Sequence, residues 1–416
     1  MAISSKERAL LRRLAGEVAE IAALPVQAQT AAEWRRLNAV KPGRPLVWID
    51  QLPWHELSVD PELALETTDP FCRGVEWNLR TTLYQWRHLR GDMVVENVYY
   101  SPLAVRDTGF GIREESRTKP QHSRGGILSR QFEAQIRDER DLERIRVPEV
   151  THDTEASERT YHTLVDLFGD ILTIQKRGVC HVWFAPWDQL ICWWDVEEAL
   201  TDMALRPELV HAAMDRLVSA HLERLRQWQE LNVLSWCRGN YRVASGGLAY
   251  TDELPAPGFD PQRVRPCDQW GCAAAQIFSE VSPKMHEQFA LQYERRWLCN
   301  FGLNYYGCCE ALHNKIHILE SVPNLRKISI SPRADAARAA EHVGGRYVLS
   351  LKPNPAIFAP DVWSPERARQ ELTELLEKTR GCVVEIVMKD VSTVRDDPRR
   401  AWEWVEIAVD VAARFA

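Results

Sequence analysis

Two adjacent thiols and a carboxylate, Cys308-Cys309-Glu310, are the residues of this chain that most directly suggest chemistry. They follow a short run around Tyr305 that we predict to be a strand broken by Gly307. Thiolates are nucleophiles and soft metal ligands, and a carboxylate binds metals or moves protons. Because successive residues of a regular strand face opposite sides, we expect at most one of the two thiols to face a pocket. A structural role as buried free cysteines is the alternative.

Other polar side chains stand where predicted strands end. In a barrel of parallel strands, these carboxyl ends converge on one site. Two prolines that follow the predicted strand 347–351 fix the backbone around Lys352 and Asn354. The residues predicted to meet at these ends are Asp50, Asp188, Glu280, Cys308, Cys309, Glu310, Ser331, Lys352, Asn354 and Asp390. For any one of them alone, a surface ion pair or a cap is the simpler explanation.

The chain has 16 tryptophans, and several of them cluster between residues 183 and 194. Trp183, Trp187 and Trp193 are candidates for the aromatic wall of a ligand pocket, because such pockets combine aromatic walls with a few polar groups. Packing in the core is the competing interpretation.

Helix-like and strand-like segments alternate along most of the chain. Predicted strands cover 46–50, 179–184, 232–236, 276–279, 327–331, 347–351 and 383–388, together with the run around Tyr305. Predicted helices cover 72–89, 160–170, 196–205, 207–230, 283–299, 312–319, 335–341, 365–378 and 399–415. This alternation predicts βαβ units of the α/β class and favours a (β/α)8 TIM barrel over an open sheet.

The predicted barrel spans residues 46–416 and follows an N-terminal helical extension, 1–45, in which residues 5–37 are predicted to be helical. The glycine-dotted segment 101–135 is predicted to be a long inserted excursion near the barrel mouth, in the form of a hairpin. It is a candidate lid or a candidate contact of a homodimer.

Composition excludes several classes of protein. The 416 residues are 27% charged with a net charge of −7, which is typical of a soluble globular protein and argues against nucleic acid as a partner. No apolar run reaches the roughly 18 residues that cross a membrane. The N-terminus lacks the apolar core of a secretory signal, and the ten cysteines do not have disulfide-framework spacing. We therefore expect a cytoplasmic protein with free thiols.

Three segments in this order, Phe278-Ser279-Glu280, Cys308-Cys309-Glu310 and 324–332, resemble the uroporphyrinogen decarboxylase superfamily, and most of all its methyltransferase-like branch. The segment 389–394 fits that branch as well. The resemblance implies a (β/α)8 barrel whose site opens at the carboxyl ends of the strands. It also implies methyl transfer between a small methylated substrate and a corrinoid (cobalamin) cofactor on a partner protein, with help from zinc.

The chain departs from the zinc pattern of that branch. Relatives carry His-x-Cys where this chain has Tyr306-Gly307-Cys308, and no later cysteine ends a predicted strand. Zinc is therefore expected to be held by Cys308 or Cys309 together with Glu280 or Glu310.

The preferred hypothesis is a corrinoid-linked methyltransferase or demethylase. Its expected catalytic residues are Glu280, Tyr306, Glu310, Lys352 and Asp390. Its expected substrate-binding residues are Asp50, Trp183, Trp187, Asp188, Trp193 and Asn354. Two alternatives stay open. One is a cofactor-independent lyase or decarboxylase that acts on a small carboxylated substrate through Glu280, Lys352 and Asp390, and the other is a non-enzymatic protein that docks a partner.

Overall fold

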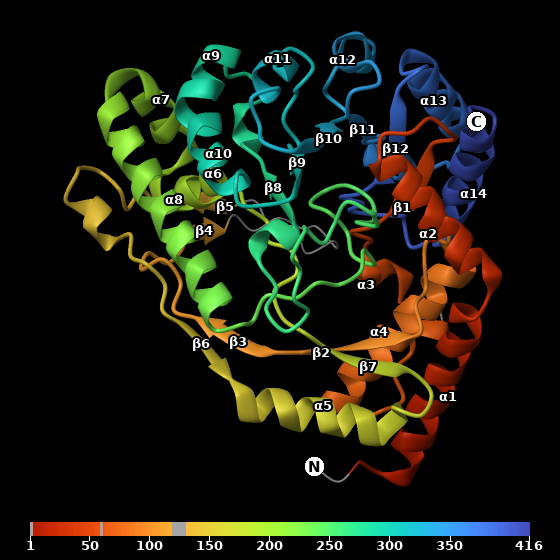
Figure 1. Ribbon diagram of the computed structural model, residues 1–416. Coiled ribbons are helices and arrows are strands. Elements are labelled where there is room, and N and C mark those ends of the chain that lie inside the picture. Colours follow the sequence, from red (N-terminus) through yellow and green to blue (C-terminus); the bar gives the residue numbers. More distant parts are fainter. Residues whose placement is uncertain (1–2, 59–60, 119–129) are drawn as a thin grey trace.

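Parallel strands form the centre of the structure, a computed structural model that describes residues 3–58, 61–118 and 130–416. Figure 1 shows the helices arranged around these strands. Six strands form one parallel sheet in the order β1-β12-β11-β10-β9-β8. Their bounds are β1 Leu46–Ile49, β8 Trp270–Ala273, β9 Leu303–Tyr306, β10 Leu325–Ile330, β11 Val348–Leu351 and β12 Val383–Met388. Because all pairings in this sheet are parallel, the carboxyl ends of the six strands lie along one edge.

A second parallel pair joins β2 (Val98–Pro102) to β7 (Thr173–Arg177). An isolated parallel bridge then pairs Val179 with Leu234. The structure is therefore of the α/β class with a six-stranded parallel sheet, and the closed (β/α)8 barrel stays a prediction.

Helical crossovers connect the successive strands from β8 to β12, as the alternation of the sequence predicts. They contain α9 (Pro283–His286), a π-helical turn (Glu287–Leu291), α10 (Gln292–Leu298), α11 (Ile316–Leu319), α12 (Ala336–Val343) and α13 (Pro365–Lys378). After β12, α14 (Arg399–Ala413) packs against β1. The earlier helices are α3 (Trp54–Leu57), α4 (Pro70–His88), α5 (Thr154–Phe168), α6 (Pro186–Trp194), α7 (Val196–Leu205) and α8 (Pro207–Glu230). Short 3-10 turns are η1 (Pro61–Leu63), η2 (Asp141–Arg144), η3 (Pro266–Asp268), η4 (Gln276–Phe278) and η6 (Pro355–Phe358).

The N-terminal region is helical over most of the predicted range 5–37, and a short break divides it into two helices. They are α1 (Ser5–Ala22) and α2 (Pro25–Asn38). The break falls at Leu24, whose backbone is extended because the ring of Pro25 disfavours a helical residue before it. Trp34 of α2 reaches the sheet region, where its indole nitrogen donates to the carbonyl of Asp92 at 2.8 Å. The division of the chain at residue 45 stays a prediction.

The inserted segment 101–135 contains antiparallel pairing, in line with the predicted hairpin. Within it β4 (Ser116–Thr118) pairs with β5 (Arg130–Phe132), and residues 119–129 between them lie outside the described part of the chain. A further antiparallel pair joins β3 (Ala104–Asp107) to β6 (Val150–Asp153).

Three predicted strands are wrong in position or type. The predicted strands 179–184 and 232–236 amount to the bridge between Val179 and Leu234, and 276–279 is mostly the 3-10 turn η4. The strand that precedes this turn is β8, which the sequence did not predict because its four residues include Gly271 and Ala273 and lack β-branched side chains.

A fully buried stretch, residues 243–250, crosses the inner face of the sheet, by which we mean the face that carries Tyr305 and Glu385. The backbone nitrogen of Gly247 donates to Glu385 at 3.1 Å. A Cβ on Gly247 would lie 2.2 Å from the ring of Trp34, so the close approach of this stretch requires glycine there. The Gly246-Gly247 pair, which predicts a loop from the sequence, thus belongs to a buried segment that packs against the inner face of the sheet.

Candidate active site

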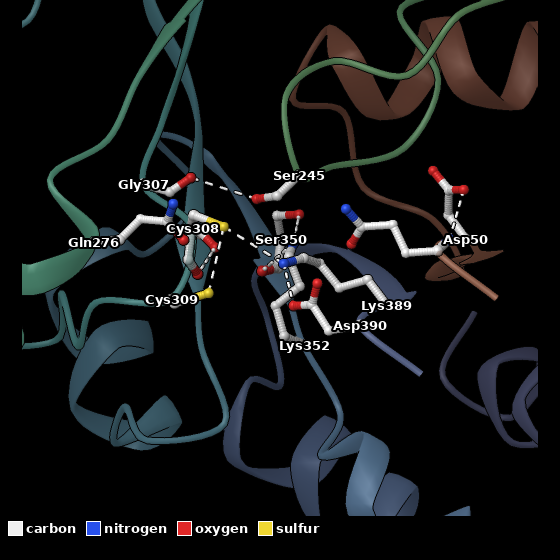
Figure 2. A network of polar contacts seen from close by, with 12 residues as sticks. Asp50, Ser245, Gln276, Gly307, Cys308, Cys309, Ser350, Lys352, Lys389 and Asp390 are labelled. Carbon is white, nitrogen blue, oxygen red and sulfur yellow. Dashed lines mark hydrogen bonds and ion pairs between the residues drawn. The ribbon is translucent and has the colours of Figure 1, made fainter. Parts of the chain in front are cut away.

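The carboxyl ends of the strands surround a cavity of about 410 Å³, which we call the Cys308 cavity. Its lining comes from the segments that follow β8 to β12: Gln276, Ser279, Cys308, Cys309, Pro332, Arg333, Lys352, Pro353, Asn354, Pro355, Lys389 and Asp390. Five residues predicted from strand ends thus meet here: Cys308, Cys309, Lys352, Asn354 and Asp390. Figure 2 shows the two thiols facing Lys389 across this space.

Both thiols line the cavity, although a regular strand would allow only one of them to do so. The reason is that β9 ends at Tyr306, before the cysteines, and Gly307 then turns with a φ of 95°. A side chain on Gly307 would also meet Leu312, since its Cβ would lie 2.4 Å from that residue. Cys308 and Cys309 therefore lie beyond the strand, where neighbouring side chains need not point to opposite faces.

Cys308 has the surroundings of a reactive thiol. Its sulfur lies 3.5 Å from that of Cys309 and 3.4 Å from the ammonium of Lys389. The hydrogen bond from Cys309 lowers the pKa of the Cys308 thiol, burial opposes this, and the charge of Lys389 lowers the pKa further. Cys309 shows the opposite effect, because its hydrogen bond to Cys308 raises the pKa of the donor thiol. Cys308, which is buried beside a cation, is thus the better nucleophile of the pair.

Lys389 and Asp390 form the opposite side of this arrangement. The ammonium of Lys389 donates to the Asp390 carboxylate at 2.5 Å. Burial alone would lower the pKa of Lys389, but the neighbouring Cys308 and Asp390 raise it overall. Lys389 therefore stays charged beside the thiol.

Glu310 braces the loop that carries the cysteines. Its carboxylate is fully buried and accepts from the backbone nitrogens of Cys308 at 2.9 Å and Ala275 at 3.0 Å. It connects the ends of β8 and β9, and it is absent from the lining of the cavity. Burial raises the pKa of Glu310. The structure thus places this predicted catalytic residue behind the reactive surface, where it positions Cys308.

Lys352 joins the cavity to a polar network on the inner face of the sheet. Its ammonium lies 2.5 Å from the hydroxyl of Ser350 and 3.1 Å from that of Tyr305. Ser350 donates in turn to Glu385 at 2.6 Å, and Glu385 pairs with Lys327 at 2.8 Å. Burial lowers the pKa of Lys352 to about 7. A lysine that titrates near neutrality is suited to give or take a proton at physiological pH.

Sequence reasoning missed the inner members of this network: Ser245, Tyr305, Lys327, Ser350 and Glu385. The signal was present for two of them, because Lys327 and Glu385 are single charges inside otherwise apolar strands. Ser245 was not predictable, since it reaches the hydroxyl of Tyr305, at 3.0 Å, from the stretch 243–250 far away in sequence.

Two predicted catalytic residues lie elsewhere. Tyr306 points to the helix side of the sheet, where its hydroxyl contacts Glu294 and His286, each at 2.6 Å. Burial raises the pKa of Glu294 to about 8, so this cluster holds a proton within the core. Glu280 is exposed, and neither it nor Tyr306 lines the Cys308 cavity.

The predicted substrate-binding residues divide in a similar way. Trp187 and Trp193 are buried in the core, and Trp183 is 41% exposed. Asp188 lies beside the cavity, because it accepts a hydrogen bond from the lining residue Gln276, and burial raises its pKa to about 6.

The side chains of Asp50 and Asn354 both already bind other residues of the protein. Asp50 is paired with Arg242. Asn354 accepts from the backbone nitrogen of Ala356 at 3.0 Å and so caps the turn η6. Asn354 also lines the cavity, whereas Asp50 does not.

The expected zinc ligands do not come together as a metal site. In the described ranges of the chain, no group of three or more His, Cys, Asp or Glu side chains is arranged to hold a metal ion. Cys308 and Cys309 lack the expected carboxylate ligand there, because Glu280 and Glu310 both lie outside the cavity lining. The ammonium of Lys389, 3.4 Å from the Cys308 sulfur, also opposes a second cation. These residues do not fit zinc, and no step proposed below uses a metal held by them.

Comparisons with known proteins give a likeness in structure but none in sequence. The chain matches no protein-family model, and no curated protein matches it in sequence. In structure it is similar to a methyltransferase from Methanosarcina mazei, with a TM-score of 0.50 and 13% identity, over 93% of this chain and 98% of that chain. At this identity the likeness shows a shared fold. Among the described residues, no helix is long and apolar enough to cross a membrane.

Proposed function

We propose that the protein is an enzyme that transfers a methyl group and that the Cys308 cavity is its active site. The observation that carries this proposal is the buried Cys308 thiol, which lies between a thiol donor and the Lys389 ammonium at the carboxyl ends of the strands. The likeness in fold to a methyltransferase adds support. A thiolate is a soft nucleophile, and a methyl carbon is a suitable target for it.

In the proposed reaction, the Cys308 thiolate attacks the methyl carbon of a small methylated substrate. The bond from sulfur to carbon forms while the bond from carbon to the leaving heteroatom breaks, and the electron pair goes to the heteroatom. Lys352, with its pKa of about 7, gives a proton to that atom. Lys389 holds the thiolate in its reactive form, and Asp390 holds Lys389. The products are S-methylated Cys308, neutral Lys352 and the protonated leaving group.

The methyl group must then leave Cys308 for an acceptor. We propose a corrinoid carried by a partner protein as this acceptor, which would supply a reduced Co(I) centre for the methyl group. The bond from the Cys308 sulfur to the methyl carbon would then break, with its electron pair returning to sulfur. Recovery of the thiolate and reprotonation of Lys352 from water complete the cycle.

The test follows the methyl group at Cys308. Purified protein is incubated with methoxyaromatic, methylamine and methylthiol donors, and the peptide that contains Cys308 is weighed by mass spectrometry. We expect the mass of one added CH2 group with the correct donor, and loss of that mass when cob(I)alamin is supplied. Cys308→Ser should abolish methylation, and Cys299→Ser, at an exposed free thiol, should retain it. The proposal fails if no donor methylates Cys308 and none yields methylcobalamin.

A second candidate function is lyase or decarboxylase activity on a small carboxylated substrate. The observation that favours it is Arg333, which lines the cavity with Lys352 and Lys389. Among the described residues no carboxylate lies within 4.0 Å of the Arg333 guanidinium. Lys352 and Asp390 would carry the acid–base work, since Glu280 lies outside the lining. Turnover of a carboxylated substrate that survives Cys308→Ser would select this function over methyl transfer.

A further inference from the structure

A second cavity, of about 550 Å³, lies between strands β1 and β2, and we call it the β1–β2 cavity. Trp48 of β1 lines one part of it, and Tyr99 and Tyr100 of β2 line another. These strands belong to different sheets, so no ladder of backbone hydrogen bonds closes the space between them. The cavity shares no lining residue with the Cys308 cavity. It is therefore a separate site.

Arg177 gives this cavity an available positive charge. Its guanidinium lies over the ring of Tyr100, 5.0 Å from the centroid, and its hydrogen-bond partner is the thiol of Cys180. Within the described ranges, no carboxylate lies within 4.0 Å of it. The other charged groups of the lining are already engaged. Glu96 accepts from the hydroxyl of Tyr250 at 2.7 Å, and Arg242 is paired with Asp50.

Uncommitted polar groups accompany Arg177 in the lining. The hydroxyl of Tyr99 and the side-chain amides of Asn78 and Asn240 make no hydrogen bond to any other residue that the structure describes. The remaining wall is largely apolar or aromatic, and Trp48 and Tyr241 are among its aromatic members. Binding pockets for small molecules have this composition, in which a few polar groups orient a ligand between aromatic walls.

We propose that the β1–β2 cavity binds a small organic anion with a planar apolar body, whose acid group pairs with Arg177. The guanidinium offers a planar fork of donors that matches a carboxylate, and Tyr99, Asn78 and Asn240 offer further hydrogen bonds to the ligand. The aromatic wall provides the contact for the planar part. The proposal does not depend on methyl transfer at Cys308, because the two cavities have no residue in common.

Calorimetric titration of the full chain with benzoate tests this proposal. Benzamide serves as a neutral probe of the same shape, and inorganic phosphate serves as an anion without an apolar body. We expect benzoate to bind more tightly than either. Arg177→Met should weaken benzoate binding roughly 10- to 100-fold, the loss typical of a charge-assisted hydrogen bond. Arg106→Met, at an exposed arginine that lines neither cavity, is the matched control and should leave benzoate affinity unchanged. Arg333→Met tests whether benzoate binds in the Cys308 cavity instead.

Several results would overturn the proposal. They are the absence of benzoate binding at millimolar concentration, equal binding of benzamide, or loss of binding in Arg333→Met with retention in Arg177→Met. Circular dichroism confirms that each variant is folded. If Arg177→Met fails to fold, Tyr99→Phe replaces it, because that change removes only a hydroxyl from the cavity. Tyr99→Phe should still weaken benzoate binding by a measurable factor, and unchanged affinity would count against the site.

Discussion

The buried ion pair between Lys327 and Glu385 provides the sharpest test of the inner network. Both side chains have no exposed surface, and their charged atoms lie 2.8 Å apart. Glu385 also accepts from Ser350 and from the backbone of Gly247. The change Glu385→Gln preserves the shape of the side chain and removes its charge. It leaves the ammonium of Lys327 buried without a counter-charge, which typically costs about 3–5 kcal/mol of stability.

The pH sets an upper limit to this cost. Lys327 escapes the penalty by releasing its proton, and the pKa of a lysine in the unfolded chain is about 10.4. Burial lowers the pKa of Lys327 in the folded chain. At pH 7, release from a group with the unfolded pKa costs about 5 kcal/mol, because each pH unit is worth about 1.4 kcal/mol. At pH 9 the same step costs about 2 kcal/mol. In the variant the unfolded chain then binds one more proton than the folded chain, so stability rises with pH up to about the unfolded pKa.

Urea unfolding at pH 7 and pH 9, followed by tryptophan fluorescence, measures the effect. We expect Glu385→Gln to lose about 3–5 kcal/mol at pH 7 and no more than about 2 kcal/mol at pH 9. Glu253→Gln is the matched control. Glu253 is half-exposed, and it pairs with Arg326, which lies next to Lys327 on β10. It should cost at most about 1 kcal/mol. A loss below about 1 kcal/mol for Glu385→Gln at pH 7, or a loss that does not shrink at pH 9, would refute the reasoning.

Three further predictions follow from the same region. The rate of acylation of Lys352 by a small amine-reactive reagent should rise with pH, with a midpoint near its pKa of about 7. Peptide mass spectrometry compares this rate with that of exposed lysines, and a midpoint as high as theirs would refute the effect of burial. Gly247→Ala should lower the melting temperature strongly, because the added Cβ would lie 2.2 Å from the ring of Trp34. Its control is Gly74→Ala in α4, where the space is open, and that change should raise the free energy of unfolding by about 0.5–1 kcal/mol. Treatment with a chelator should leave alkylation of Cys308 by iodoacetamide unchanged, and slower or faster alkylation would reveal a metal at the thiols.

The later strands and helices were predictable because local patterns agree with their final places. Strand β12 and helix α13 have the bounds that were predicted, since one is a continuous apolar run and the other begins with Ser364 as a cap and a proline at its first position. The short β8 was not predictable, because Trp270–Ala273 is held by neighbours on one side and has little strand propensity of its own. The sequence of these four residues does not show that β9 will pair with them.

The candidate site was predictable in part for the same physical reason. Convergence of strand ends follows from parallel topology, and it correctly joined Cys308 with Lys352 and Asp390. The prediction did not include Lys389 or Gln276, because each is a single polar residue beside a stronger candidate in the sequence. Nor did the pattern distinguish Tyr306, which lies on the opposite side of the sheet, from a cavity residue. That distinction depends on where β9 ends, and strand ends are set by tertiary contacts.

The two lysines of the cavity have pKa values that their surroundings shift in opposite directions. Lys352 and Lys389 follow the neighbouring strands β11 and β12, and both are buried. Lys352 contacts neutral hydroxyls of Tyr305 and Ser350, so burial dominates and lowers its pKa to about 7. Lys389 contacts the Asp390 carboxylate and the Cys308 sulfur, and these partners raise its pKa against the effect of burial. Environments that move two similar groups apart in this way identify which one exchanges protons. We therefore propose Lys352 as the proton donor of the cavity and Lys389 as its permanent charge.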